Sequence, residues 1–113
     1  MKKLINEQLN TLDKVNEFIN EQQLALLYVT MPQCSVCDGL RPQIKTLIEK
    51  YPHIHFGEVD ASHVEKIKGQ FSIFTAPVVI LFLNGKEYLR EARIIHTRLL
   101  EEKINRIYDH VVD

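Results

Sequence analysis

Cys34 and Cys37 are the residues whose type and spacing most directly suggest chemistry, and the chain has no other cysteine. Ser35 and Val36 separate them, and the apolar pattern that follows predicts a helix starting at about Cys34. Residues three apart on a helix share a face, so the two sulfur atoms could close a small disulfide ring. The free amide groups and dipole at a helix N-terminus also stabilise a thiolate, which is the nucleophilic form of cysteine.

The two cysteines are expected to play different roles. Cys34, at the helix start, should benefit most from this stabilisation and be the more exposed, whereas Cys37 should lie buried one turn further in. This arrangement suits attack by Cys34 on a substrate disulfide, followed by attack of Cys37 on the mixed disulfide that results.

A C-x-x-C pair is also half of a zinc site, which needs about four ligands. The chain has no second pair, and its five histidines are scattered along the sequence. We therefore expect no metal site within one chain. Two alternatives stay open: a metal ion or iron–sulfur cluster that two chains share through Cys34 or Cys37, and two chemically inert cysteines.

Several strands are predicted around the cysteine pair. The runs 24–30 and 78–83 are almost continuously apolar, as expected for strands that are covered on both faces. Residues 54–59 alternate and predict another strand. Asn84-Gly85 predicts a two-residue hairpin turn into a more polar strand at 86–93.

Helical periodicity and capping residues predict four helices, one before the strand 24–30 and the others between and after the strands. Their expected features are a cap at Asn10 or Thr11, Pro42 within the helix after Cys34, a capping box formed by Ser62 and Glu65, and a cap at Thr97. Residues 3–8 could form a short strand or extend the first helix. Three phenylalanines are expected in the core: Phe71, Phe74 and Phe82. The order of elements predicts one α/β domain over residues 1–113, a three-layer α/β/α sandwich with a mixed sheet of four to five strands.

Charge and hydropathy exclude some functions. The net charge of −1 comes with no basic block, which argues against binding to nucleic acid or to an anionic membrane. Lys2 and Lys3 could begin a signal peptide, but polar residues such as Asn6 and Glu7 interrupt any apolar stretch behind them. The longest apolar run, 77–83, is too short to span a bilayer. We therefore expect a cytoplasmic protein, where a close cysteine pair is seldom a structural disulfide.

These features together resemble the thioredoxin superfamily. The likeness rests on the apolar strand 24–30, the C-S-V-C motif opening a helix that contains Pro42, the segment Thr75-Ala76-Pro77 before an apolar strand, and Asn84-Gly85. It implies a thioredoxin-like fold and a thiol–disulfide oxidoreductase that reduces protein disulfides without an organic cofactor. Its partners would be disulfide-containing proteins, with a reductase or a low-molecular-weight thiol as electron donor.

The resemblance also assigns roles to single residues. Cys34 matches the attacking cysteine and Cys37 the resolving one. Pro77 matches a proline whose preceding peptide bond is cis, so that the backbone of Thr75 and Ala76 could hold an extended substrate beside the cysteines. Without the resemblance, Pro77 would more simply begin a strand. Gln33, just before the motif, is a further candidate for contact with substrate.

The chain departs from the family in two places. Typical thioredoxins read W-C-G-P-C where this chain reads Q-C-S-V-C, so their redox potential cannot be carried over, although we expect a reducing one. Where the family has a buried aspartate that accepts the proton of the resolving thiol, this chain has Tyr28, a poor base at neutral pH. We hypothesise that Glu58, at the position of a family lysine, replaces that aspartate as proton acceptor, with Tyr28 hydrogen-bonded to it.

Two other interpretations stay open. The missing tryptophan and aspartate favour a thioredoxin-fold binding module that docks a partner near Pro77 without turnover. Thr75-Ala76-Pro77 is also similar to the T-x-P segment of glutaredoxins, but we find no glycine pair after the following strand to bind glutathione.

Overall fold

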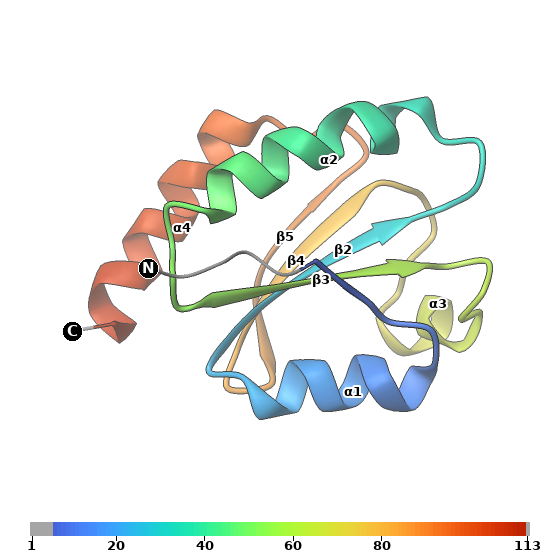
Figure 1. Ribbon diagram of the computed structural model, residues 1–113, viewed down its shortest axis with the longest axis horizontal. Helices are drawn as coiled ribbons and strands as arrows, with labels where there is room; N and C mark the ends of the chain where they lie inside the picture. Colours follow the sequence, from blue (N-terminus) through green and yellow to red (C-terminus); the bar gives the residue numbers. More distant parts are fainter. Residues whose placement is uncertain (1–5, 113) are drawn as a thin grey trace.

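The computed structural model describes residues 6–112 of the 113-residue chain, so Lys2 and Lys3 lie outside the described residues. Helices and strands alternate along most of this length (Figure 1). In chain order the elements are β1 (Asn6–Gln8), α1 (Leu12–Glu21), β2 (Leu24–Thr30), α2 (Ser35–Ile48), β3 (Ile54–Asp60), α3 (Lys66–Gln70), β4 (Val78–Leu83), β5 (Lys86–Ala92) and α4 (Thr97–Val111).

The described strands form one mixed sheet in the order β1-β3-β2-β4-β5. Strands β1 and β2 run parallel to β3, whereas β4 is antiparallel to both β2 and β5. Helices α1 and α3 cover one face, and α2 and α4 cover the other (Figure 1). The predicted three-layer sandwich is therefore confirmed. For residues 3–8 the sequence allowed either a short strand or an extension of the first helix, and Asn6–Gln8 is a strand.

Strand β2 lies at the centre of the sheet, and all seven of its residues are buried. Its side chains alternate between two apolar cores: Ala25, Leu27 and Val29 pack with α1 and α3, and Leu24, Leu26 and Tyr28 pack with α2 and α4. Full burial of a large apolar side chain stabilises a fold by about 1.5–3 kcal/mol. Because helices cover both faces of β2, the run 24–30 is apolar without alternation. The same packing holds in place the strand that leads to the cysteines.

Local turn chemistry agrees with the sequence in two places. The Thr11 hydroxyl caps α1 by accepting a hydrogen bond from the Lys14 N–H at 3.1 Å, which selects one of the two predicted caps. Asn84 and Gly85 have φ values of 51° and 84°, as a type I′ hairpin turn requires. Helix α2 continues through Pro42, also as predicted.

Two predicted helix caps are wrong. The Ser62 hydroxyl and N–H both donate to the Asp60 carboxylate, at 2.7 and 2.8 Å, so Ser62 closes a turn after β3 and caps no helix. Helix α3 starts only at Lys66, without a side-chain cap. Thr97 is the first residue of α4, and His96 occupies the N-cap position without a capping hydrogen bond. The charged Asp60 carboxylate, two residues earlier, is a strong acceptor, so the Ser62 hydroxyl and N–H both donate to it in a local turn.

The prediction for Phe74 is also wrong. Phe82 is buried and Phe71 packs against the core, but Phe74 is 84% exposed in the loop before β4. Ile73, its neighbour, is buried instead. In a loop without regular periodicity, hydrophobicity alone does not decide which of two adjacent apolar side chains points inward.

No helix within residues 6–112 is long and apolar enough to cross a membrane.

Candidate active site

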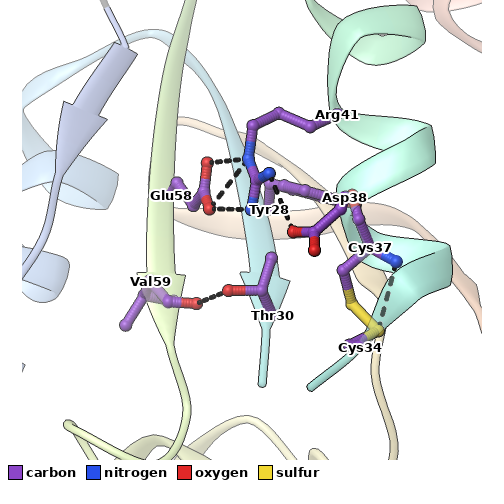
Figure 2. Close-up of a disulfide and its surroundings, with 8 residues drawn as sticks. All are labelled: Tyr28, Thr30, Cys34, Cys37, Asp38, Arg41, Glu58 and Val59. Atoms are coloured by element: carbon purple, nitrogen blue, oxygen red, sulfur yellow. Dashed lines mark hydrogen bonds and ion pairs between the residues drawn. A yellow bond between two sulfur atoms is a disulfide. The ribbon is translucent and has the colours of Figure 1, made fainter. Parts of the chain in front are cut away.

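The two cysteines form a disulfide at the N-terminus of α2 (Figure 2). Their Cα atoms are 5.2 Å apart, and the Cys37 N–H lies 3.1 Å from the Cys34 sulfur as a hydrogen-bond donor. Cys34 occupies the N-cap position and is partly exposed, whereas Cys37 is 1% exposed. An amide N–H aimed at this sulfur would stabilise a Cys34 thiolate once the disulfide is reduced.

Three further segments reach the same end of the sheet as the disulfide. Strand β2 leads to the cysteines, β4 begins there, and β5 ends there, because Val29 pairs with Val78 and Val78 with Ala92. The Ala76–Pro77 peptide bond is cis, as the resemblance implied. The Pro77 carbonyl accepts a hydrogen bond of 2.9 Å from the N–H of Arg93, the residue after β5.

The residues expected to bind substrate lie in these segments. Thr75 and Ala76 are partly exposed, directly before the buried Pro77. Gln33 is exposed beside Cys34 and has a left-handed backbone with φ of 57°. A non-glycine residue in this region costs about 1–3 kcal/mol, a strain that tends to occur at functional sites.

Glu58 forms a partly buried ion pair with Arg41 (Figure 2). The carboxylate, on β3, accepts three hydrogen bonds of 2.9, 3.1 and 2.7 Å from the guanidinium, on α2. Glu58 is only 5% exposed, so its charge requires a partner of opposite sign. Arg41 also donates to the exposed Asp38 at 3.1 Å, which links the pair to the first turn of α2.

The predicted hydrogen bond between Tyr28 and Glu58 is wrong. The Tyr28 hydroxyl donates instead to the Cys37 backbone carbonyl, at 2.7 Å. Burial raises the pKa of Tyr28 to about 12, and the Arg41 guanidinium only partly offsets this. Tyr28 therefore keeps its proton at neutral pH and acts as a fixed donor that joins β2 to Cys37.

Arg41 is the residue of this cluster that sequence reasoning missed. The hydrogen bond to Glu58 raises the pKa of Arg41 above its already high value, so the guanidinium is permanently charged. Its Cζ atom lies 6.0 Å from the centre of the Tyr28 ring. One signal was available: Arg41 follows Cys37 by four residues, which brings both to the same side of α2.

Within the described part of the chain, no group of three or more His, Cys, Asp or Glu side chains could hold a metal ion. The chemistry that this arrangement supports by itself is thiol–disulfide exchange between a partly exposed and a buried sulfur.

Comparison with known proteins identifies the family. The family model of thioredoxin matches residues 7–106. A thioredoxin-like protein of Bacillus subtilis (strain 168), YdfQ, is 38% identical over 100 residues, which cover 88% of this chain and 89% of that protein. The chain belongs to the thioredoxin family.

Solved thioredoxins have the same fold at low sequence identity. A mutant thioredoxin from Halobacterium salinarum NRC-1 superposes with a TM-score of 0.82 at 16% identity, over 96% of this chain and 94% of that one. Fasciola hepatica thioredoxin gives a TM-score of 0.77 at 24% identity, over 88% and 97%. Family membership and a C-x-x-C pair at disulfide distance make this thioredoxin-family protein a thiol–disulfide oxidoreductase.

Proposed function

We propose that this protein reduces disulfide bonds in other proteins, with Cys34 as the nucleophile and Cys37 as the resolving thiol. The observation that carries the proposal is the asymmetry of the pair, since Cys34 is partly exposed at the helix N-cap and Cys37 is buried. An exposed thiolate can reach an external disulfide, and a buried thiol three residues away can resolve the intermediate without meeting another substrate.

The exchange has two balanced steps. The Cys34 thiolate attacks one sulfur of the substrate disulfide, and the other substrate sulfur leaves as a thiolate. The Cys37 thiol then loses its proton and attacks the Cys34 sulfur, so the second substrate thiolate leaves and a Cys34–Cys37 disulfide remains. Two electrons have passed to the substrate, and a reductase or a low-molecular-weight thiol would return the protein to its dithiol form.

The substrate segment next to the attacked disulfide is proposed to lie against Gln33, Thr75, Ala76 and Pro77. Supporting this, Cys34 and these residues belong to segments that reach one end of the sheet. The loop before β4 would offer backbone groups to an extended peptide, the usual basis of strand-like recognition. Such a contact would orient a protein disulfide for attack by Cys34.

Glu58 is proposed as the proton acceptor for Cys37. Tyr28 retains its proton and cannot take this role at neutral pH. Glu58 lies directly opposite Tyr28 in the parallel pairing of β2 and β3, and Tyr28 contacts Cys37. The proton transfer would run directly or through one water molecule, as general bases commonly act.

We propose the cytoplasm as the compartment, because its reducing environment keeps such a cysteine pair in the dithiol form.

The first test is the reduction potential of the Cys34–Cys37 couple, from thiol alkylation after equilibration in graded dithiol buffers. A reversible two-electron transition at the reducing end of the family's range is expected, together with reduction of insulin disulfides by the dithiol protein. Cys34→Ser should abolish insulin reduction, and Cys37→Ser should accumulate a mixed disulfide through Cys34. If no Cys34–Cys37 disulfide formed at any buffer potential, the enzymatic role would be rejected in favour of a binding module.

A further inference from the structure

Arg93 is an exposed arginine directly after β5, and its backbone has an unusual conformation. Its φ of 68° lies in the left-handed region, which residues other than glycine adopt uncommonly. Its N–H donates to the Pro77 carbonyl at 2.9 Å, so the residue is anchored to the loop that precedes β4. Residues held in such strained conformations tend to cluster at functional sites.

The guanidinium of Arg93 is a cation that the fold leaves available. Within residues 6–112, which the structure describes, its side chain takes part in no ion pair. The charged residues nearest to it along the chain are paired elsewhere, Glu91 with Lys103 and Arg98 with Glu102. Arg93 can therefore bind an anion that comes from outside the fold without giving up an internal partner.

The carboxylates at the same end of the sheet are also occupied. Asp38, in the first turn of α2, is bound to Arg41 at 3.1 Å. Asp60, at the end of β3, accepts hydrogen bonds from the Ser62 hydroxyl and N–H. These acidic groups have their own local donors, so the charge of Arg93 is directed to solvent and to whatever binds beside the cysteines.

Strand pairing places Arg93 beside the proposed path of the substrate. Strand β4 alone separates β5 from β2, which leads to Cys34. Since neighbouring strands lie about 4.8 Å apart, Arg93 is about 10 Å across the sheet from the end of β2. An extended segment rises by about 3.3 Å per residue, so residues two or three positions from a cysteine attacked by Cys34 lie at a similar distance, about 7–10 Å.

We propose that Arg93 is a specificity residue that favours protein disulfides with an Asp or Glu two or three positions from the attacked cysteine. The inference rests on the proposed function and names a substrate class for the same site, an extended acidic segment. The guanidinium would bind the substrate carboxylate through charge-assisted hydrogen bonds while the disulfide lies against Cys34. The exchange of sulfur partners itself needs no contribution from Arg93.

The test compares two synthetic peptides, each closed by one disulfide and identical except for Glu or Gln two positions from each cysteine. The rate constant for reduction by the dithiol protein is divided by that for dithiothreitol, which removes the intrinsic difference between the peptides. The protein should prefer the acidic peptide about two- to fivefold at an ionic strength of about 10 mM, as expected for an exposed ion pair. The preference should shrink at about 150 mM, where the Debye length is only about 8 Å.

Variants assign this preference to one side chain. Arg93→Gln should abolish it, Arg93→Lys should keep part of it, and Arg93→Glu should reverse it. Arg93→Gly removes the charge and suits a φ of 68°, so it serves if the other variants do not fold. Lys86→Gln removes an exposed cation from the opposite end of the same strand and should leave the preference unchanged.

A preference that survives in folded Arg93→Gln or Arg93→Gly would overturn the proposal. So would an equal loss of rate with both peptides, which would mean that Arg93 acts on the cysteines, or the absence of a preference in the wild type. All three results would leave the proposed function intact, because the peptides would still be reduced. If the wild-type protein reduced neither peptide while dithiothreitol reduced both, the proposed function itself would be rejected.

Discussion

Tyr28 occupies the position at which typical thioredoxins carry a buried aspartate, and its chemistry differs from that of a carboxylate in two ways. It keeps its proton at neutral pH, because burial raises its pKa to about 12. It also donates to the Cys37 carbonyl, so it holds the backbone of this cysteine in place. Tyr28 is therefore a structural hydrogen-bond donor and does not act as a base at neutral pH.

Replacing Tyr28 by Phe tests this assignment. The change removes one buried hydrogen bond of 2.7 Å without removing the ring, so we expect the free energy of unfolding to fall by about 1–2 kcal/mol. Urea denaturation of the oxidised protein would measure it. Tyr88→Phe, at a half-exposed ring on β5, is the matched control and should change stability by less than about 0.5 kcal/mol. Equal effects of the two variants would contradict a role for the Tyr28 hydroxyl.

The way each element is encoded decides how much of it the sequence could predict. Strands β2 and β4 were predictable, because burial on both faces demands continuous apolar runs. The Arg41–Glu58 pair was not predictable, because the two residues are 17 positions apart, one on a helix and one on a strand, and no local pattern links them. The failed capping box has the same origin: Ser62 had two competing partners, and only the backbone path after β3 selects Asp60.

The turn after β3 makes stability depend on pH. Burial opposes ionisation of Asp60, but the Ser62 hydroxyl and N–H, with help from His63, outweigh it and lower the pKa of Asp60. A carboxyl whose pKa is lower in the folded state stabilises the fold above its unfolded value of 3.8, and this contribution is lost as the pH falls through the folded value.

Asp60→Asn should therefore reduce the free energy of unfolding by about 1 kcal/mol at neutral pH, and by progressively less as the pH falls below about 4. Urea denaturation at a series of pH values would measure the difference. Glu65→Gln, at an exposed ion pair with Lys68, is the control and should have little effect at any pH. A cost for Asp60→Asn that stayed constant down to pH 3 would show that the charge contributes nothing.

For the whole molecule, the topology gathers exposed apolar side chains at one end of the sheet. Val36 follows β2 and Cys34, Phe74 precedes β4, and Ile94 follows β5, and these strands are paired so that the three segments share an end. Their exposed fractions are 59%, 84% and 75%. Exposed apolar groups around a reactive centre favour partners that bring apolar surface of their own, as a protein substrate does.

Phe74→Ser should therefore weaken the reaction with protein disulfides and spare the reaction with small ones. We expect KM for insulin to rise several-fold, since loss of one large apolar contact costs about 1–3 kcal/mol at most, with kcat nearly unchanged. The rate with 5,5′-dithiobis(2-nitrobenzoate) should stay the same, because a small disulfide needs only access to Cys34. Tyr88→Ser, at an exposed ring within β5, should alter neither reaction. An equal loss with both substrates would mean that Phe74 acts on the cysteines, and no loss would mean that protein substrates bind elsewhere.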